Sequence, residues 1–388
     1  MILVYMLHLF NYFIYRISIA DMFLIVLVLY VFVKQKRIVF KSYHPFLLLF
    51  WFLTGAFSLL NLYANYFSFK DFILAYAKFS LYIVAFIILP PYFAKNFDKL
   101  NKIIVNSLII LCGLGIYQLI AHYFYPFLPY SLTLEGFSHR PGYYAMFSYA
   151  GTFRIKSIFS EPAAFAIYLN LLYAYLLHNN IRLKLWVHLL IISTVIFTLA
   201  LSGIGLLMLN YFLLSIKNKV IKTKKALLYS LVFIGILAII INNVYVTTRI
   251  GRIVSLTEGS GTKRLLGGFE LAKDFPFYGI GVGNLESFYY SLNKTFEYAT
   301  SWTIQNIIPI ILSYSGIVGL ILFLAFLYQL NKDNIFLGIF LFATFFTTGG
   351  FNATSFWLFL ILITTGNIYK NLSKKTVLDS IECLKNAK

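Results

Sequence analysis

Residues 72–93 read FILAYAKFSLYIVAFIILPPYF and contain one charged side chain, Lys78. A helix of this length extends for about 33 Å, which is enough to cross the roughly 30 Å hydrocarbon core of a bilayer. Residues 17–33, 43–62 and 103–125 are also apolar over nearly the same length. The whole chain is 60% hydrophobic and 12% charged, whereas soluble proteins contain about 25% charged residues. We therefore predict an all-α, polytopic integral membrane protein.

Basic residues divide the predicted loops into two sets. The set with 20 basic residues comprises residues 34–41, 94–102, 179–185, 217–225, 331–334 and the tail 370–388. The facing loops hold 10, and only Lys70 among these lies in a short loop. Because basic residues in short loops stay in the cytoplasm, the first set is predicted to be cytoplasmic, together with the C-terminus. This bias also accounts for the net charge of +19, so no nucleic-acid partner is expected.

We expect 11 or 12 transmembrane helices in a single domain, residues 1–388. The expected spans are 17–33, 43–62, 72–93, 103–125, 162–178, 186–201, 203–216, 226–241, 303–328, 335–348 and 351–369. Two long apolar runs are interrupted, one at 201–203 and the other at 348–350, which predicts helix pairs joined by tight external turns. Residues 2–15 are either a twelfth span or an interfacial helix. Two long loops, about 126–161 and 242–302, are left on the external side.

Several kinds of chemistry are not supported by the residues. The six histidines are scattered, no CxxC or HxxxH spacing occurs, and no phosphate-binding P-loop is present, so we expect no metal site and no cofactor. The glycines at 279, 281 and 283 lack the strand and helix of a dinucleotide site. Asp21 is the only carboxylate within an expected span, which weakens a transporter driven by ions or protons.

Arginine is unevenly distributed between the two sides. Five of eight arginines are external, but only five of 24 lysines are; the five arginines are Arg140, Arg154, Arg249, Arg252 and Arg264. Arginine presents a planar fork of donors that matches phosphate bidentately, whereas lysine is a point charge. The asymmetry favours a phosphate or pyrophosphate ligand at the outer surface. Pairing with external carboxylates or with lipid head groups is the alternative.

Two external segments carry the candidate site. In the first, Arg154 precedes Glu161-Pro162 at the predicted start of a helix. Glu161 is either a general base or simply a residue that stabilises the helix start, with Ser160 as a possible N-cap. The second, residues 262–288, predicts an amphipathic helix from Lys263-Arg264 followed by a glycine-rich turn. Alternatively this helix lies on the membrane with its cations on head groups.

These segments resemble the O-antigen polymerase and ligase superfamily of bacterial multispan glycosyltransferases. The first similarity is Arg154, a short spacer and Glu-Pro; the second is Arg264, an apolar helix and the Pro-aromatic-Gly-x-Gly-x-Gly turn at 276–283. The third is Asn306 leading to Ser315-Gly316-Ile-Val-Gly319. Ligases of the superfamily carry His-Asn where this chain has Gln305-Asn306, and glutamine cannot take a proton near neutral pH. The resemblance therefore implies a polymerase rather than a ligase.

The resemblance implies a substrate and a location. The polymerase would join undecaprenyl-pyrophosphate-linked repeat units into an O-antigen or capsule-like polysaccharide of the cell envelope. It would act at the external, periplasmic face of the bacterial cytoplasmic membrane. Arg154, Glu161 and Arg264 are the expected catalytic residues; the expected substrate-binding residues are Arg140, Lys156, Arg249, Arg252, Lys263 and Gln305. Expected partners are membrane lipids and, in the same pathway, a chain-length regulator and a flippase that handle lipopolysaccharide precursors.

Two other classes compete with a polymerase. A flippase or exporter of lipid-linked sugar also needs external arginines, but it is expected to place cations deep in a central cavity and to show an internal repeat. We see no repeat, and Lys78 is the only cation deep within a span. A structural partner of a polysaccharide-synthesising complex is the third alternative.

The charge pattern predicts the topology directly. Reporter fusions after residues 40, 100, 221 and 375 should report the cytoplasm, and fusions near 145 and 275 should report the external side. The physical reason is the retention of short basic loops in the cytoplasm. Cytoplasmic signals near 145 and 275 would contradict both the orientation and the external site.

Overall fold

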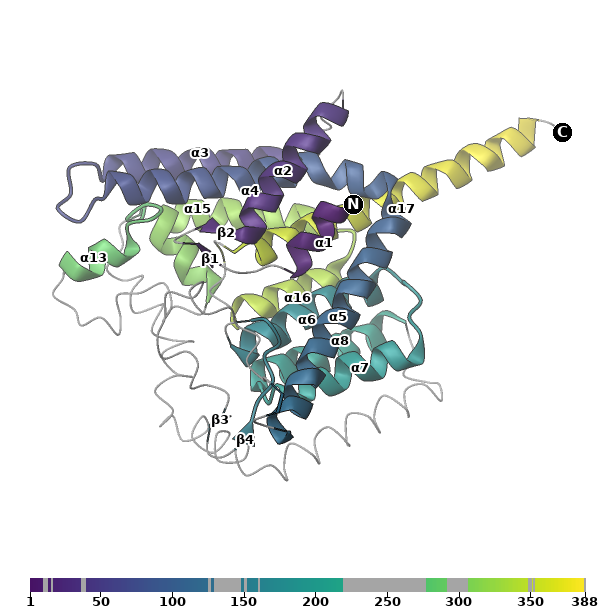
Figure 1. The fold of residues 1–388 in the computed structure, drawn as a ribbon. Helices are drawn as coiled ribbons and strands as arrows, with labels where there is room; N and C mark the ends of the chain where they lie inside the picture. Colours follow the sequence, from purple (N-terminus) through teal and green to yellow (C-terminus); the bar gives the residue numbers. More distant parts are fainter. Residues whose placement is uncertain are drawn as a thin grey trace.

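The computed structural model is a bundle of helices (Figure 1). It describes residues 1–9, 13–14, 17–35, 40–124, 127–128, 148–149, 152–159, 161–218, 277–291, 306–347, 351 and 353–386. Extended structure within these ranges is limited to two antiparallel pairs of two-residue strands. Phe13–Ile14 (β1) pairs with Ile17–Ser18 (β2), and Ser148–Tyr149 (β3) pairs with Thr152–Phe153 (β4). The predicted helical class is confirmed.

Three described helices are long and apolar enough to cross a membrane, namely α4, α5 and α15. The helices are α1 (Ile2–Leu9), α2 (Ile19–Lys34), α3 (His44–Leu60), α4 (Phe69–Lys95), α5 (Phe97–Tyr123), α6 (Pro162–His178), α7 (Leu185–Phe197), α8 (Leu201–Lys217), α13 (Leu285–Ser291), α15 (Ile307–Asn331), α16 (Ile335–Phe345) and α17 (Thr354–Asn386). At eight residues, α1 extends for only about 12 Å, too short to cross a bilayer. It packs instead against α2 and α5.

The helices form two groups that α17 joins. Helices α3, α4 and α15 lie alongside one another, while α6, α7, α8 and α16 pack together beside α5 (Figure 1). The first part of α17 packs against both α4 and α6. Its C-terminal end extends away from the bundle (Figure 1).

The apolar run 186–216 is two helices joined by a tight turn, as predicted, but the turn lies at 198–200. We expected the break at 201–203 because Gly203 interrupts the run. Gly203 is instead within α8, where a Cβ would lie 2.3 Å from the Ala166 Cβ of α6. Its glycine character therefore serves close helix packing rather than a turn. The predicted span 226–241 and the break at 348–350 lie outside the described residues.

A buried ion pair connects three helices. Lys78 Nζ of α4 lies 2.9 Å from Asp21 Oδ2 of α2. Asp21 Oδ1 accepts hydrogen bonds from the Tyr82 hydroxyl at 2.7 Å and from Thr354 Oγ1, at the start of α17, at 2.5 Å. Ser18 completes the set, because its backbone N–H donates to Asp21 Oδ2 at 2.8 Å in a capping box. The two charged residues that the sequence places within separate expected spans, Asp21 and Lys78, are thus each other's partner.

A break in α15 receives the glycine-rich turn. Gly316 has φ 63° and interrupts the helix, and a Cβ there would lie 1.7 Å from the Phe277 carbonyl oxygen. The Ser313 carbonyl, which a continuous helix would bond internally, accepts the Ile280 N–H at 2.8 Å. The turn also reaches α3, since the Val282 N–H donates to Ser58 Oγ at 2.9 Å. Gly279 has φ 73° and packs on Ser313 and Gly316, so the turn is a docking element of the bundle.

The ion pair should show strong coupling between its two residues. Lys78→Met leaves a buried carboxylate without its cation and should lower the free energy of unfolding by roughly 3 kcal/mol. The double variant Asp21→Asn/Lys78→Met should recover most of that loss, because neither charge remains. Unfolding in detergent, followed by circular dichroism, measures both variants. Lys34→Met, at an exposed lysine of α2, is the control and should be nearly neutral, and additive single effects would contradict the coupling.

Candidate functional site: a buried cationic segment

The residues from Phe153 to Phe159 form a segment that lies between α5 and the turn joining α7 to α8. The Ile155 N–H donates to the Phe197 carbonyl at 3.4 Å, at the end of α7. At the other side, the Phe153 ring stacks on His122 of α5 with centroids 4.1 Å apart. Ile155 and Phe159 are almost fully buried. A loop that the sequence places at the outer surface therefore enters the bundle; we call it the buried segment.

Gln118 of α5 holds the middle of the buried segment. Its side-chain oxygen accepts the N–H groups of Lys156 at 3.1 Å and of Ser157 at 2.7 Å, and its Nε2 donates to the Ser157 carbonyl at 2.8 Å. Ser157 has φ 53°, a left-handed conformation that costs free energy in a residue with a Cβ. Its hydroxyl donates to the Leu111 carbonyl at 3.0 Å. These four hydrogen bonds stabilise a strained turn at the residue that follows Lys156.

Arg154 is anchored by a hydrogen bond from its own side chain. Its Nε donates to the Thr198 carbonyl at 2.9 Å, a carbonyl made available because α7 ends at Phe197. Leu199, the next residue, has φ 49°, so the acceptor also lies in a strained turn. The anchored Nε fixes the plane of the guanidinium. Arg154 itself is 8% exposed.

Lys156 is buried two residues further along and is 2% exposed. Burial lowers the pKa of its ammonium from the ordinary 10.5 to about 8, because removal from water disfavours the charged form. A cation in such a site gains more from binding an anion than an exposed lysine does, since the surroundings screen the attraction weakly. Arg154 and Lys156 thus provide two cations of different geometry in one segment.

Glu161 lies at the N-cap of α6, with Pro162 at the first helical position. The sequence suggested Ser160 as the N-cap and left Glu161 either as a helix-start residue or as a base. The Glu161 side chain makes no capping hydrogen bond, so the start of α6 does not use its carboxylate in that way. The partly exposed Glu161 therefore lies two residues after the end of the buried segment, and its carboxylate does not cap α6.

The remaining predicted site residues lie outside the described ranges. These are Arg140, Arg249, Arg252, Lys263, Arg264 and Gln305. Asn306, which follows Gln305, caps α15 by accepting the Ile308 N–H at 3.0 Å. Two of the three motif segments do meet, because the turn at 277–283 docks on the Gly316 break of α15.

The sequence did not indicate three of the residues that shape this site. Gln118 was placed in a predicted span and looked like any polar residue of a helix, and Ser157 and Thr198 carry no motif. Their roles depend on pairings across 39 to 46 residues. The available signal was a glutamine near the external end of an apolar helix, where a buried amide needs a partner.

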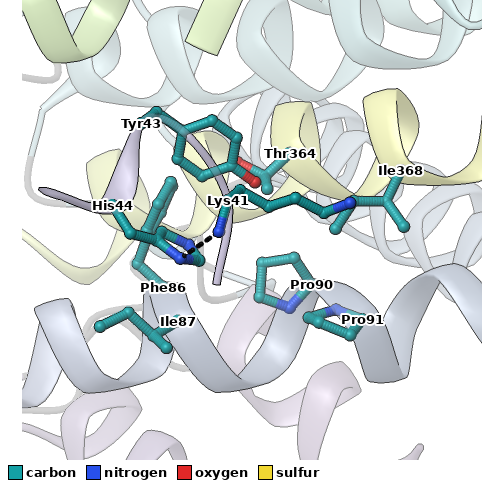
Figure 2. A pocket seen from close by; sticks show the side chains of 9 residues that line it. All are labelled: Lys41, Tyr43, His44, Phe86, Ile87, Pro90, Pro91, Thr364 and Ile368. Carbon is teal, nitrogen blue, oxygen red and sulfur yellow. Dashed lines mark hydrogen bonds between the residues drawn. The ribbon is translucent and has the colours of Figure 1, made fainter. Parts of the chain in front are cut away.

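A small crevice lies far along the chain from this segment, beside Pro90 and Pro91 of α4 (Figure 2). Its free space of about 150 Å³ includes open solvent, and it encloses no volume that a water-sized molecule could occupy. Its lining residues are Lys41, Tyr43, His44, Phe86, Ile87, Pro90, Pro91, Thr364 and Ile368. The Lys41 N–H donates to His44 Nδ1 at 3.0 Å (Figure 2). The crevice is too small to hold a sugar.

The described residues form a helical protein of membrane character in which two cationic side chains, Arg154 and Lys156, are buried in one segment. No three His, Cys, Asp or Glu side chains gather as a metal site within the described residues. No family model, no curated protein and no solved structure matches the chain.

Affinity for a pyrophosphate group at the buried segment should fall as the pH rises through about 8, because Lys156 attracts an anion only while it is protonated. Folding stability should change in the opposite direction. The folded-state pKa lies below the unfolded value, so the unfolded chain binds more protons between about 8 and 10.5. The free energy of unfolding therefore increases with pH over that window. Calorimetric titration with a short-chain prenyl pyrophosphate measures the affinity.

Lys156→Arg should retain binding at the higher pH, since arginine stays charged. Arg154 in the same segment, His122 near the end of α5 and Glu161 before α6 also carry ionisable side chains. His122→Gln is the control and should leave the decline near pH 8 unchanged. An affinity independent of pH in the wild-type protein would show that Lys156 does not contact the anion.

Proposed function

We propose that this protein polymerises oligosaccharide repeat units carried on undecaprenyl pyrophosphate, in the bacterial cytoplasmic membrane and at its external face. The proposal includes 11 or 12 membrane spans and a cytoplasmic C-terminus. The observation that carries it is the buried segment, in which an anchored arginine and a buried lysine precede the Glu161 carboxylate. That combination provides charge for a pyrophosphate and a base for a hydroxyl.

Each group has a role in the transfer. The terminal hydroxyl of one lipid-linked glycan attacks the anomeric carbon of the other. A carbon–oxygen bond forms there as the bond to the lipid pyrophosphate breaks. Arg154 and Lys156 stabilise the negative charge that develops on the leaving pyrophosphate. Glu161 accepts the hydroxyl proton. The proposal keeps Arg264 as a catalytic cation together with Arg154, and it assigns Arg140, Arg249, Arg252, Lys263 and Gln305 to substrate binding.

Helix lengths support an active site recessed below the outer surface. Helices α6 and α8 have 17 residues and α7 has 13, so they extend for about 25 Å and about 20 Å. If their lysine-rich ends lie at the cytoplasmic surface, the turn at 198–200 stops short of the opposite side of a roughly 30 Å core. Arg154 bonds to that turn. The cations would then lie within the membrane thickness, near the level of a lipid-linked pyrophosphate.

One observation favours a second candidate, a flippase or exporter of lipid-linked sugar. Transporters place charged pairs inside their spans, and the Asp21–Lys78 pair is of that kind. The pair is fully engaged with Tyr82 and Thr354, which suits a structural connection equally well. A ligase of the same superfamily is the remaining alternative.

A reconstituted reaction separates these candidates. Purified protein in liposomes, given only a lipid-pyrophosphate-linked repeat unit and EDTA, should produce a ladder of longer lipid-linked glycans. A ligase would need a separate acceptor, and a flippase would move the substrate without a change in mass. If verified substrate yields no ladder with wild-type protein, the polymerase proposal is wrong.

Glu161→Gln should slow the ladder by roughly a hundredfold or more while substrate binding is retained, because the amide keeps the size of the side chain but accepts no proton. Asp333→Asn makes the same chemical change at an exposed position between α15 and α16 and should have no effect. Mass spectrometry of the products measures the rates. Normal polymerisation by Glu161→Gln would assign Glu161 to the helix start alone.

A further inference from the structure

A second group of cations lies at the opposite end of α6 from Glu161. Lys217, the last residue of α8, donates from Nζ to the His178 carbonyl at 2.6 Å. Lys370 of α17 donates to the same carbonyl at 3.3 Å. The two ammonium nitrogens are therefore no farther apart than the sum of these distances. Two positive charges from distant parts of the chain converge on one backbone oxygen.

The end of α6 explains why one lysine binds there. Asn180 has φ 59°, and the N–H groups of Asn180 and Ile181 donate to the carbonyls of Leu177 and Leu176 at 3.0 Å. This closing turn leaves the His178 carbonyl for a cation, and a helix C-terminus attracts positive charge. The dipole supplies about half a unit of negative charge.

The packing around His178 brings the second lysine close. In α17, Gly366 lies one turn before Lys370, and a Cβ at Gly366 would lie 2.6 Å from Asn179 Oδ1. The absence of a side chain at 366 therefore lets α17 approach the end of α6. In α8, Asn210 lies two turns before Lys217 on the same face, and its Oδ1 lies 3.2 Å from His178 Nε2. Helices α8 and α17 therefore both lie close to residues 178 and 179 at the end of α6.

Some buried polar atoms beside the lysines lack a hydrogen-bond partner among the described residues. Three buried atoms make no hydrogen bond among the described residues: His178 Nδ1, Asn179 Oδ1 and Asn210 Nδ2. Buried polar atoms are normally paired. Lys217 and Lys370 are only partly buried. The cluster is polar and positively charged, and it lies where α6 meets α8 and α17.

We infer that Lys217 and Lys370 form a binding site for a phosphate group at this end of α6. Basic clefts between membrane helices bind the head groups of anionic lipids, and lysine binds phosphate as a point charge. The same chemistry is offered by the phosphodiester of phosphatidylglycerol and by a soluble glycerol phosphate. The inference does not depend on the proposed glycosyl transfer, because the lysines lie at the other end of α6 from Glu161.

Binding of a fluorescent short-chain phosphatidylglycerol to the detergent-purified full chain tests the site. Lys217→Gln and Lys370→Gln should each weaken binding roughly fivefold, the equivalent of about 1 kcal/mol per basic residue. Lys217→Arg should restore it, since the charge returns. Lys332→Gln removes an exposed lysine between α15 and α16 and should leave binding within about twofold of wild type.

Two further measurements distinguish the sources and the structural alternative. Competition by soluble glycerol phosphate indicates a site for a free phosphate, whereas displacement only by lipid indicates a head-group site. Circular dichroism and size-exclusion chromatography check that each variant is folded. If the folded double variant Lys217→Gln/Lys370→Gln binds phosphatidylglycerol as tightly as wild type, or Lys332→Gln weakens binding equally, the lysines only cap α6 and the inference is overturned.

Discussion

The pairing of Lys78 with Asp21 is the constraint on which the arrangement of the helices depends. A charge in an apolar interior is costly unless an opposite charge and further hydrogen bonds satisfy it. Here the carboxylate takes its bonds from α4, from the start of α17 and from the residue before α2. The starts of α2 and α17 must therefore lie at the level of Lys78. Because α17 also packs against α6, the position of α17 also affects how the second group of helices lies against the first.

Helix ends and breaks in the interior provide the attachment points for distant segments. The break at Gly316 releases the Ser313 carbonyl, and the glycine-rich turn supplies the N–H of Ile280. The end of α7 releases the carbonyls of Phe197 and Thr198, and the buried segment supplies Ile155 N–H and Arg154 Nε. In each case a backbone group without a helical partner accepts a hydrogen bond from a distant segment and helps to position that segment in the bundle.

Cationic side chains lie near both ends of α6. Its N-terminus follows the buried segment, where Arg154 and Lys156 concentrate positive charge before Glu161. Its C-terminus leaves the His178 carbonyl to Lys217 and Lys370. One buried helix therefore lies between a proposed site for a pyrophosphate that reacts and an inferred site for a phosphate that only binds. The two sites differ in composition, since an anchored arginine is present only at the first.

The sequence by itself determined the helical class and the positions of most helices, because long apolar runs leave the backbone no partner other than its own helix. The run 162–178 was predicted to the residue, and residue type and order led to the proposal of Arg154, Lys156 and Glu161 as site residues. Tertiary structure decided which polar groups meet. Asp21 and Lys78 are 57 residues apart, and Gln118 and Ser157 are 39 apart, and nothing local in the sequence encodes either pair. It also decided that Gly203 packs against Ala166 instead of forming a turn, because a glycine in a sequence permits both a bend and a close approach, and only the neighbouring helix determines which one is used.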